Sequence, residues 1–314
     1  MLSSIGKWAR EWSQANPWTN VYGVARSLLA LQTAAMLLVN RTGNLFPPAV
    51  GTPDPPTCAS LAQLSLFCVV PEGALEVARW TAIVILLVVA SGWRPRITGI
   101  LHWWVSFSIP TTAVLSSGGD AITSILTFLL LPLTLTDPRR WHWTTLGQRW
   151  QKVSPYRRFF AWTAALLIRI QMSAIYFHSA VGKVPVEEWA NGTAIYYWLT
   201  DPWFGMPPWV EPALAPLLTS GVVVTILSWG TILLEFFLFA GLVMDRRGWP
   251  YLLTCGIALH VGIAVLQGLP SFSLAMIGAL LLYLRPLNQP FDWIQRARSI
   301  VSGQWERVSL QGTA

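Results

Sequence analysis

The stretch that decides the fold is RFFAWTAALLIRIQMSAIYFHSAVG, residues 158–182. Between Arg158 and Lys183, the only charged side chain is that of Arg169. A helix needs about 20 mostly apolar residues to cross a hydrocarbon core of roughly 30 Å. Residues 158–182 therefore predict a transmembrane helix.

Seven further stretches have the same character. The chain of 314 residues is 54% hydrophobic and only 11% charged, which excludes a soluble globular protein of ordinary composition. We therefore predict an all-α fold, a polytopic transmembrane helix bundle of about eight spans. The other predicted spans are residues 21–39, 74–92, 97–115, 120–136, 218–244, 250–267 and 271–285.

The two ends of the chain differ from the spans. Near the N-terminus, Ile5, Trp8 and Trp12 recur at helical spacing beside basic residues, which is typical of an amphipathic helix on a membrane surface. The C-terminal end shows the same pattern more weakly, and a partly ordered tail is the alternative there. The predicted organisation is an interfacial amphipathic segment at 1–20, a single transmembrane domain at 21–285 and a cytoplasmic basic tail at 286–314.

Basic side chains predict the orientation. Sixteen of the 21 Lys and Arg residues fall on the side that holds both termini, two fall on the opposite side and three lie within spans. Short cytoplasmic loops are enriched in Lys and Arg, so both termini are predicted to be cytoplasmic, in a multi-pass protein of the bacterial plasma membrane. The net charge of +7 then reflects orientation, and no nucleic acid partner is expected.

Two longer segments, 40–73 and 183–217, fall on the predicted outer side. The first contains Cys58 and Cys68, which predict a disulfide in that compartment, with two unpaired thiols as the alternative. No Cys or His cluster has the spacing of a metal site. The second segment predicts amphipathic helices lying over the outer mouth of the bundle. Its interface aromatics are Trp189, Tyr196, Tyr197, Trp198, Trp203 and Trp209.

Ionisable side chains at membrane depth are candidates for function because each costs on the order of 3 kcal/mol to bury there. They are Arg26, Arg79, His102, Arg169, His178, Glu235 and His260. Counted from the inner ends of their helices, Arg169 and Glu235 lie at similar depths, which predicts an ion pair with a structural role or a place on a proton or substrate path. Arg26 and Arg79 are expected to extend toward the interfaces.

A polar stripe follows one face of the fifth span. Arg169, Tyr176 and Lys183 are spaced seven residues apart, so they share a face of a straight helix. A packing seam has the same spacing, which leaves the role of Tyr176 open. His178 lies about 200° around the helix from Tyr176 and is expected to make a different contact.

Lys183 is unusual in this chain. Only three lysines occur, and this one lies on the side that basic residues avoid. Lysine can release its proton when it is desolvated, whereas arginine practically cannot, so Lys183 is a candidate general base. The alternative is an interfacial lysine paired with a nearby glutamate such as Glu187 or Glu188.

Several long motifs carry a resemblance to a known family. NPWTNVYGVARSLLAL, IYFHSAVGKVPVEEWANGTAIYYWLTDPWFG and LHVGIAVLQGLPSFSLAMIGALLLYLRP resemble bacterial sporulation-delaying protein B. That group belongs to the HTTM membrane proteins, which are distantly similar to vitamin K-dependent gamma-glutamyl carboxylase. The resemblance covers roughly residues 16–290. It implies the maturation of a secreted peptide toxin together with a small partner protein.

The similarity to the carboxylase implies roles for particular residues. In AVGKVPVEEW, Lys183 matches the lysine that acts as the base in the carboxylase, Trp189 matches a tryptophan, and Gly182 replaces another lysine. His260 matches a histidine of a late membrane helix, and His102 matches a further histidine more loosely. The large lumenal domain of the carboxylase has no counterpart here, so carboxylation of a protein substrate does not follow.

Three functional hypotheses result. The first is a maturation factor for a secreted, cationic peptide, with Lys183 and His260 as its polar centre and a cavity formed with Arg169, Tyr176, His178, Glu235, Trp189 and His102. The second is a quinol-dependent carboxylase-like or epoxidase-like enzyme, with a membrane quinol as its cofactor. The third is a non-catalytic receptor, immunity protein or transporter.

Overall fold

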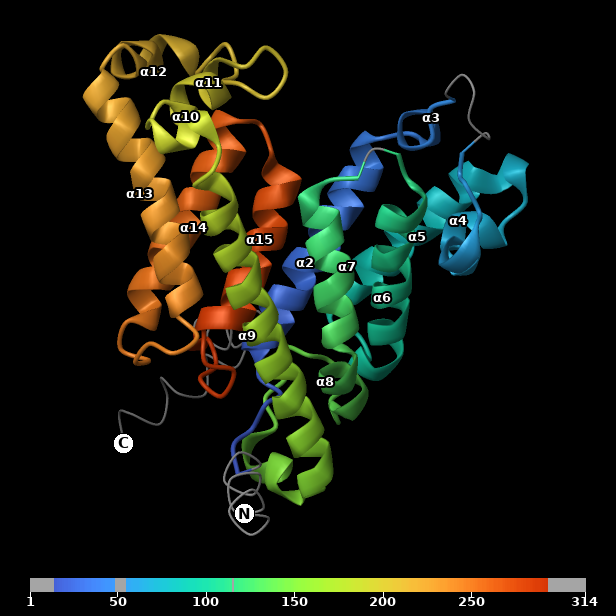
Figure 1. The fold of residues 1–314 in the computed structure, drawn as a ribbon. Helices are drawn as coiled ribbons and strands as arrows, with labels where there is room; N and C mark the ends of the chain where they lie inside the picture. The colour runs from blue at the N-terminus through green and yellow to red at the C-terminus, as the bar shows by residue number, and fades with distance from the viewer. Residues whose placement is uncertain (1–13, 49–54, 115, 293–314) are drawn as a thin grey trace, which may run out of the picture.

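The computed structural model describes residues 14–48, 55–114 and 116–292, and within these ranges the chain is helical, without a strand. The long helices are α2 (Asn20–Val39), α5 (Leu75–Ser91), α6 (Pro95–Thr112), α7 (Gly118–Leu129), α9 (Pro155–Lys183), α13 (Gly221–Ala240), α14 (Trp249–Leu266) and α15 (Pro270–Leu284). The short α-helices are α3 (Thr42–Leu45), α4 (Leu66–Val69), α8 (Leu131–Thr136), α10 (Glu187–Ala190), α11 (Ala194–Thr200) and α12 (Glu211–Leu218), and 3-10 turns cover Ser60–Leu64, Glu72–Ala74 and Gly147–Lys152. Helices α10, α11 and α12 lie together at one end of the bundle, which we call the upper end (Figure 1).

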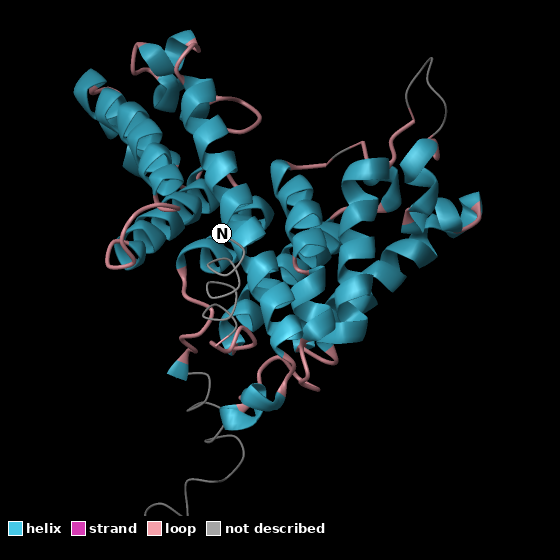
Figure 2. Cartoon of the chain, turned by 60° about the horizontal axis from the view of Figure 1, so that its bottom comes forward, coloured by secondary structure: helices cyan, strands magenta, loops and turns pink. Residues whose placement is uncertain are grey.

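The prediction of an all-α membrane bundle is confirmed. Each of the eight predicted spans coincides with one helix or, at 120–136, with the pair α7 and α8. Five segments are long and apolar enough to cross a membrane, namely Asn20–Val39, Gly118–Thr136, Pro155–Lys183, Gly221–Ala240 and Trp249–Leu266, and Pro270–Leu284 is a shorter apolar helix. Figure 2 shows these helices joined by loops at their ends. The number of spans and the orientation stay predictions.

Proline explains where several of these helices begin. Pro95, Pro155 and Pro270 each occupy the first turn of their helices, where the missing N–H costs no intrahelical hydrogen bond. Pro132 acts differently, because it begins α8 within a continuous apolar stretch and divides the predicted span 120–136.

Helix α15 lies at the centre of the packing although it has only 15 residues. It packs against α2, α7, α9 and α14, and its second half, from Gly278 to Leu284, is buried throughout. Its composition is apolar on all sides, as expected for a helix surrounded by others. A second core, formed by α2, α5 and α6 with the short α3 and α4, lies on the other side of α2.

The chain after α15 folds back onto the start of α2. The Asn20 side chain accepts a hydrogen bond from the Phe291 N–H at 2.8 Å and donates one to the Phe291 carbonyl at 2.9 Å. Thr19 Oγ1 donates to the Leu287 carbonyl. Residues 286–292 therefore belong to the bundle, while the rest of the predicted tail and residues 1–13 of the predicted interfacial segment lie outside the described residues.

A buried polar cluster joins the 137–143 loop to α2 at the lower end, opposite α10–α12. Asp137 and Arg139 form an ion pair at 2.8 Å with both side chains almost fully buried, and the Tyr22 hydroxyl donates to Asp137. Arg26 is fully buried beside them and donates to Thr98 Oγ1 at 2.6 Å. The expectation that Arg26 extends to an interface is therefore wrong, because the folded loop supplies its surroundings.

His142 closes this cluster. Burial, together with nearby Arg26 and Arg139, keeps the pKa of His142 well below its usual value, so the ring is neutral near pH 7. The backbone N–H of His142 donates to the Gly92 carbonyl at 2.9 Å, and the His142 ring packs on Gly92 in the turn between α5 and α6. This turn needs glycine, since Gly92 has φ +87° and a Cβ there would lie closer than 3.0 Å to the His142 ring.

Gly92→Ala should destabilise the protein more than Gly147→Ala. Both glycines have positive φ, which costs a residue with a Cβ about 1–2 kcal/mol, but a Cβ at Gly147 meets nothing within 4 Å. The clash at Gly92 adds about 1–3 kcal/mol. Thermal unfolding in detergent should show the larger decrease in midpoint temperature for Gly92→Ala. Equal decreases would mean that the close contact with His142 does not affect stability.

The upper end carries the two predicted outer segments. Cys58 and Cys68 form a disulfide, which confirms that prediction. The segment after α9 forms α10, α11 and α12 above the bundle, as expected (Figure 1). Of the predicted interface aromatics, Tyr196, Tyr197, Trp198, Trp203 and Trp209 are exposed, whereas Trp189 is buried and belongs to the cavity described below.

Candidate functional site

A cavity of about 270 Å³ lies between α9, α13, α14 and α15, beneath α10 and α11. Its polar lining includes Lys183, Glu235, Tyr176 and His260. Four residues that were singled out as separate candidates in the sequence therefore face the same space. Much of the remaining wall is apolar, and includes Leu259, Ile263, Phe272 and Met276.

An ion pair between Lys183 and Glu235 forms the centre of this cavity. Lys183 Nζ lies 2.8 Å from Glu235 Oε1 and 2.7 Å from Oε2. Ser179, one helical turn before Lys183, accepts from Nζ at 2.7 Å and donates to Glu235 Oε1 at 2.9 Å. The lysine side chain is 20% exposed and the glutamate side chain 9%, so the pair faces the cavity with little open solvent.

The depth of this pair follows from how α9 and α13 are staggered. Lys183 is the last residue of α9, yet its partner lies five residues before the end of α13 at Ala240. From Gly221 to Glu235, α13 advances 14 residues, or roughly 21 Å at 1.5 Å per residue. The pair thus lies well inside the bundle, below the upper end of α13.

Glu235 reaches the cavity because it belongs to the buried face of α13. The buried residues of that helix are Val224, Ser228, Ile232, Glu235 and Leu238, which recur at the three- and four-residue spacing of one helix face. This face packs on α9. A carboxylate on it must find a cation or lose its charge, and Lys183 supplies the cation.

Tyr176 and His260 form a second polar pair in the same wall. The Tyr176 hydroxyl lies 3.1 Å from His260 Nε2, and both residues are almost fully buried. The direction of this hydrogen bond depends on which imidazole nitrogen carries the proton. Nδ1 of His260 is buried and has no hydrogen-bond partner among the described residues.

Trp189 closes the cavity beneath the cap, by which we mean residues 184–220 with helices α10, α11 and α12. Lys183 Nζ lies 5.3 Å from the centre of the Trp189 ring, within the range of a cation–π interaction. Pro185 follows the end of α9, and the next residues begin α10, which brings Trp189 back over the lysine. Glu187 and Glu188 point away into the exposed surface, so neither nearby glutamate is the partner of Lys183.

Three other candidates lie away from this cavity. Arg169 shares the α9 stripe with Tyr176 and Lys183, but it lines a separate cavity near the lower end. His178 is exposed beside Phe177, on another face of α9. His102 is buried in α6, where its Nε2 has no partner among the described residues.

The expected pairing of Arg169 with Glu235 is wrong. Glu235 pairs with Lys183, and the Arg169 guanidinium instead stacks over the Trp249 ring at 4.2 Å. The depth comparison assumed that α9 and α13 end at the same level. Because α9 is shifted toward the lower end, Lys183 rather than Arg169 reaches Glu235.

Two polar residues of the cavity escaped the sequence reasoning. Ser179 lies four residues before Lys183, and this spacing on an apolar helix would have been enough to place both side chains on one face. Gln267 lies at the end of α14 and also lines the cavity, but no sequence pattern marks it.

The chemistry available here is proton exchange and recognition of polar groups. Both carboxylate oxygens of Glu235 lie within 2.8 Å of Nζ, so a proton can pass from Lys183 to Glu235 without movement of the helices. His260 and Tyr176 add a second pair that can donate or accept a proton. The apolar wall keeps these groups out of bulk water, which strengthens their electrostatic interactions.

Two curated proteins are similar to the chain along most of its length. It is 40% identical to the uncharacterized protein YitO of Bacillus subtilis (strain 168) over 300 residues, covering 94% of this chain and 96% of that protein. It is 38% identical to sporulation-delaying protein SdpB of the same strain over 276 residues, covering 87% of this chain and 84% of that protein. No family model and no solved structure matches the chain, and the similarity to the carboxylase stays a prediction.

Proposed function

The chain belongs to the sporulation-delaying protein B family, and we propose that it is a membrane factor for the maturation of a secreted peptide toxin. The observation that carries this proposal is the Lys183–Glu235 pair in a cavity beneath an amphipathic cap. Ionisable groups at membrane depth are costly, and this pair lines a cavity that a bound group can share. We place this activity at the outer side of the bacterial plasma membrane, with a small partner protein as the second component.

The charge of the cap supports a cationic substrate. Residues 184–220 contain Glu187, Glu188, Asp201 and Glu211 and no Lys or Arg. The three glutamates are exposed, and exposed aromatics such as Trp203 and Trp209 lie between them. A surface of carboxylates and aromatic rings attracts a basic, amphipathic peptide, both by charge and by apolar contact.

The cavity also supports a second candidate, an enzyme that uses a membrane quinol. A quinol needs an apolar wall for its ring and a polar end for its hydroxyl groups. Leu259, Ile263 and Phe272 offer such a wall, and Lys183 and His260 lie at the polar positions. The quinol would supply redox chemistry when bound, while Lys183, with Glu235 as its proton acceptor, would be the base near its hydroxyl group.

Complementation tests the proposed function directly. In Bacillus subtilis that lacks its own sporulation-delaying protein SdpB, producing this chain should restore the mass and yield of the exported toxin peptide that the parent strain makes. Intact-mass analysis of the culture medium is the measurement, and a strain carrying the empty vector is the control. Identical peptide products with and without the chain would contradict the proposal.

A further inference from the structure

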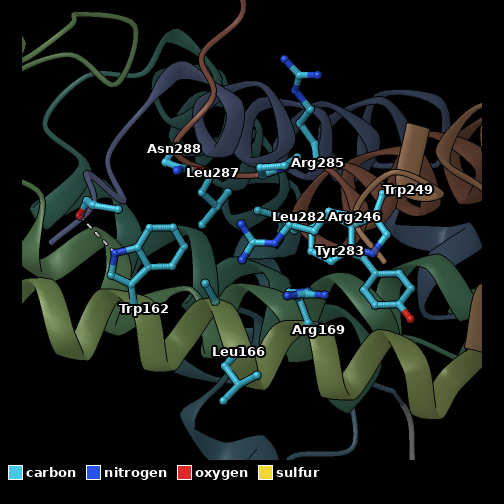
Figure 3. Close-up of a pocket in the computed structure, with 13 residues that line it drawn as sticks. Trp162, Leu166, Arg169, Arg246, Trp249, Leu282, Tyr283, Arg285, Leu287 and Asn288 are labelled. Carbon is cyan, nitrogen blue, oxygen red and sulfur yellow. Dashed lines mark hydrogen bonds between the residues drawn. The ribbon is translucent and has the colours of Figure 1, made fainter. Parts of the chain in front are cut away.

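A second cavity, of about 190 Å³, lies near the lower end of the bundle and collects three arginines from separate elements. Arg169 comes from α9 and Arg246 from the turn between α13 and α14 (Figure 3). Arg285, the residue after α15, also lines the cavity, but its guanidinium turns away from the other two and lies 5.0 Å from the centre of the Phe291 ring. The three arginines are 77 and 39 residues apart in the sequence, so only the fold brings them together. This cavity is separate from the one that holds Lys183.

Trp249 holds two of these cations close to each other. The Arg169 guanidinium lies 4.2 Å from the centre of the Trp249 ring, and the Arg246 guanidinium lies 5.4 Å from it. Two like charges on one ring repel each other, and the quadrupole of a single indole offsets this only in part. The arrangement is therefore one that an anion between the guanidinium groups would stabilise.

The described part of the chain does not supply that anion. Among the described residues, none of the three arginines has a carboxylate oxygen within 4.0 Å. The Nε atoms of Arg169 and Arg285 and the Nε1 atom of Trp249 are buried without a hydrogen-bond partner there. Buried N–H groups without an acceptor are costly, so the neighbouring donors of Arg169 and Trp249 mark a place for acceptor oxygens.

The position and the remaining lining indicate what kind of anion fits. Helices α13 and α15 end and α14 begins at this level, whereas α9 continues beyond it (Figure 1). The cavity thus opens where the membrane-spanning part of these three helices stops. Beside the arginines it presents apolar surface from Trp162, Leu166 and Leu282. A small anion that carries an apolar group matches both features, because its oxygens can accept hydrogen bonds from the arginines while the apolar group contacts the apolar lining.

We propose that this cavity binds the phosphate headgroup of an anionic phospholipid from the adjoining leaflet. The guanidinium groups of Arg169 and Arg246 bind the phosphate oxygens, and Trp249 Nε1 donates a further hydrogen bond. The acyl chains leave along the apolar side of the cavity, next to Leu166 and Trp162. The lipid thereby holds α9 and the α13–α14 turn together.

The test is lipid binding by the purified full-length chain and matched arginine variants. Native mass spectrometry in detergent would follow titration with dioleoyl phosphatidylglycerol, with dioleoyl phosphatidylcholine as the neutral lipid and inorganic phosphate as the free anion. Arg246→Gln should weaken phosphatidylglycerol binding about tenfold, since it removes a charge-assisted hydrogen bond. Arg247→Gln is the matched control, because Arg247 is the next residue of the same turn and does not line the cavity.

The outcomes distinguish binding in this cavity from non-specific attraction of anionic lipids to a basic protein surface. We expect phosphatidylglycerol to bind more tightly than phosphatidylcholine. The affinity of Arg247→Gln for phosphatidylglycerol should stay within about twofold of that of the unaltered chain. The double variant Arg169→Gln with Arg246→Gln should lose its selectivity for the anionic lipid. Equal losses in Arg246→Gln and Arg247→Gln would overturn it, and so would equal affinity for the two lipids. Binding of inorganic phosphate as tightly as phosphatidylglycerol would replace the lipid site by a site for the free anion.

Discussion

Lys183→Arg should lower the yield of matured peptide by about a hundredfold while the protein accumulates at the level of the unaltered chain. Arginine keeps the positive charge, and it can still pair with Glu235, which now lies 2.7 Å from Nζ. It cannot release a proton under cellular conditions. The substitution therefore removes proton exchange at this position while it preserves the electrostatic contact.

The measurement is the intact mass and amount of the exported peptide in the complemented strain, with protein levels matched by immunoblot. Glu187→Gln is the control, because Glu187 is exposed, lies four residues after Lys183 and does not contact it. A normal product from the Lys183→Arg strain would show that the lysine acts only as a cation. That result would favour the receptor, immunity or transport hypothesis over an enzyme, although it would leave the complementation by the unaltered chain in place.

Much of this site could be predicted from the sequence, and the reason is geometric. The seven-residue spacing of Arg169, Tyr176 and Lys183 requires one helix face, and in the structure all three do turn toward α13–α15. The end of the apolar stretch at Lys183 also predicts where the helix ends, and α9 does end at that residue, while the catalytic role of Lys183 stays a prediction.

The partners of these residues could not be predicted, because they depend on how the helices are staggered. Counting residues from helix ends gives relative depths only if the ends are level. Here the last residue of α9 meets a residue five positions from the lower end of α13. The spacing of residues within one helix carries no information about how far α9 is shifted along α13. It is set by packing between helices, including the contacts of α15 with α2, α9 and α14.

Arg26 shows a second limit of sequence reasoning. By position it lies near a helix end, where a long side chain normally reaches the interface. The loop that follows α8 instead folds over it, and Thr98, Val89 and His142 surround the guanidinium. Basic loop residues such as Arg139 were counted only as orientation signals, yet Arg139 is buried in an ion pair.

Glu235→Gln should destabilise the protein by about 3 kcal/mol, because it leaves the Lys183 ammonium without its counter-charge in a largely enclosed cavity. Lys183→Met should cost at least as much, since the carboxylate it leaves behind is the more buried partner. The double variant Lys183→Met with Glu235→Gln removes both charges and should recover most of the loss. Thermal unfolding of the four proteins in detergent forms a double-mutant cycle that isolates the pair.

Glu76→Gln provides the comparison for an ion pair that is less enclosed. Glu76 pairs with Arg79 at 2.8 Å, close to the 2.7 Å of the Lys183–Glu235 pair, but the Glu76 side chain is 47% exposed, so its loss should cost about 1 kcal/mol or less. If Glu235→Gln is no more costly than Glu76→Gln, the cavity is open to water and the Lys183–Glu235 pair is screened.

The double variant decides between shape and charge. If it is as unstable as the single variants, the neutral side chains do not fit the cavity. Shape, and not charge, would then hold α9 against α13. Recovery in the double variant would instead mean that the fold does not need this ion pair. Because charge is costly inside a membrane, a function of Lys183 and Glu235 in the cavity would then explain why both charged residues are present.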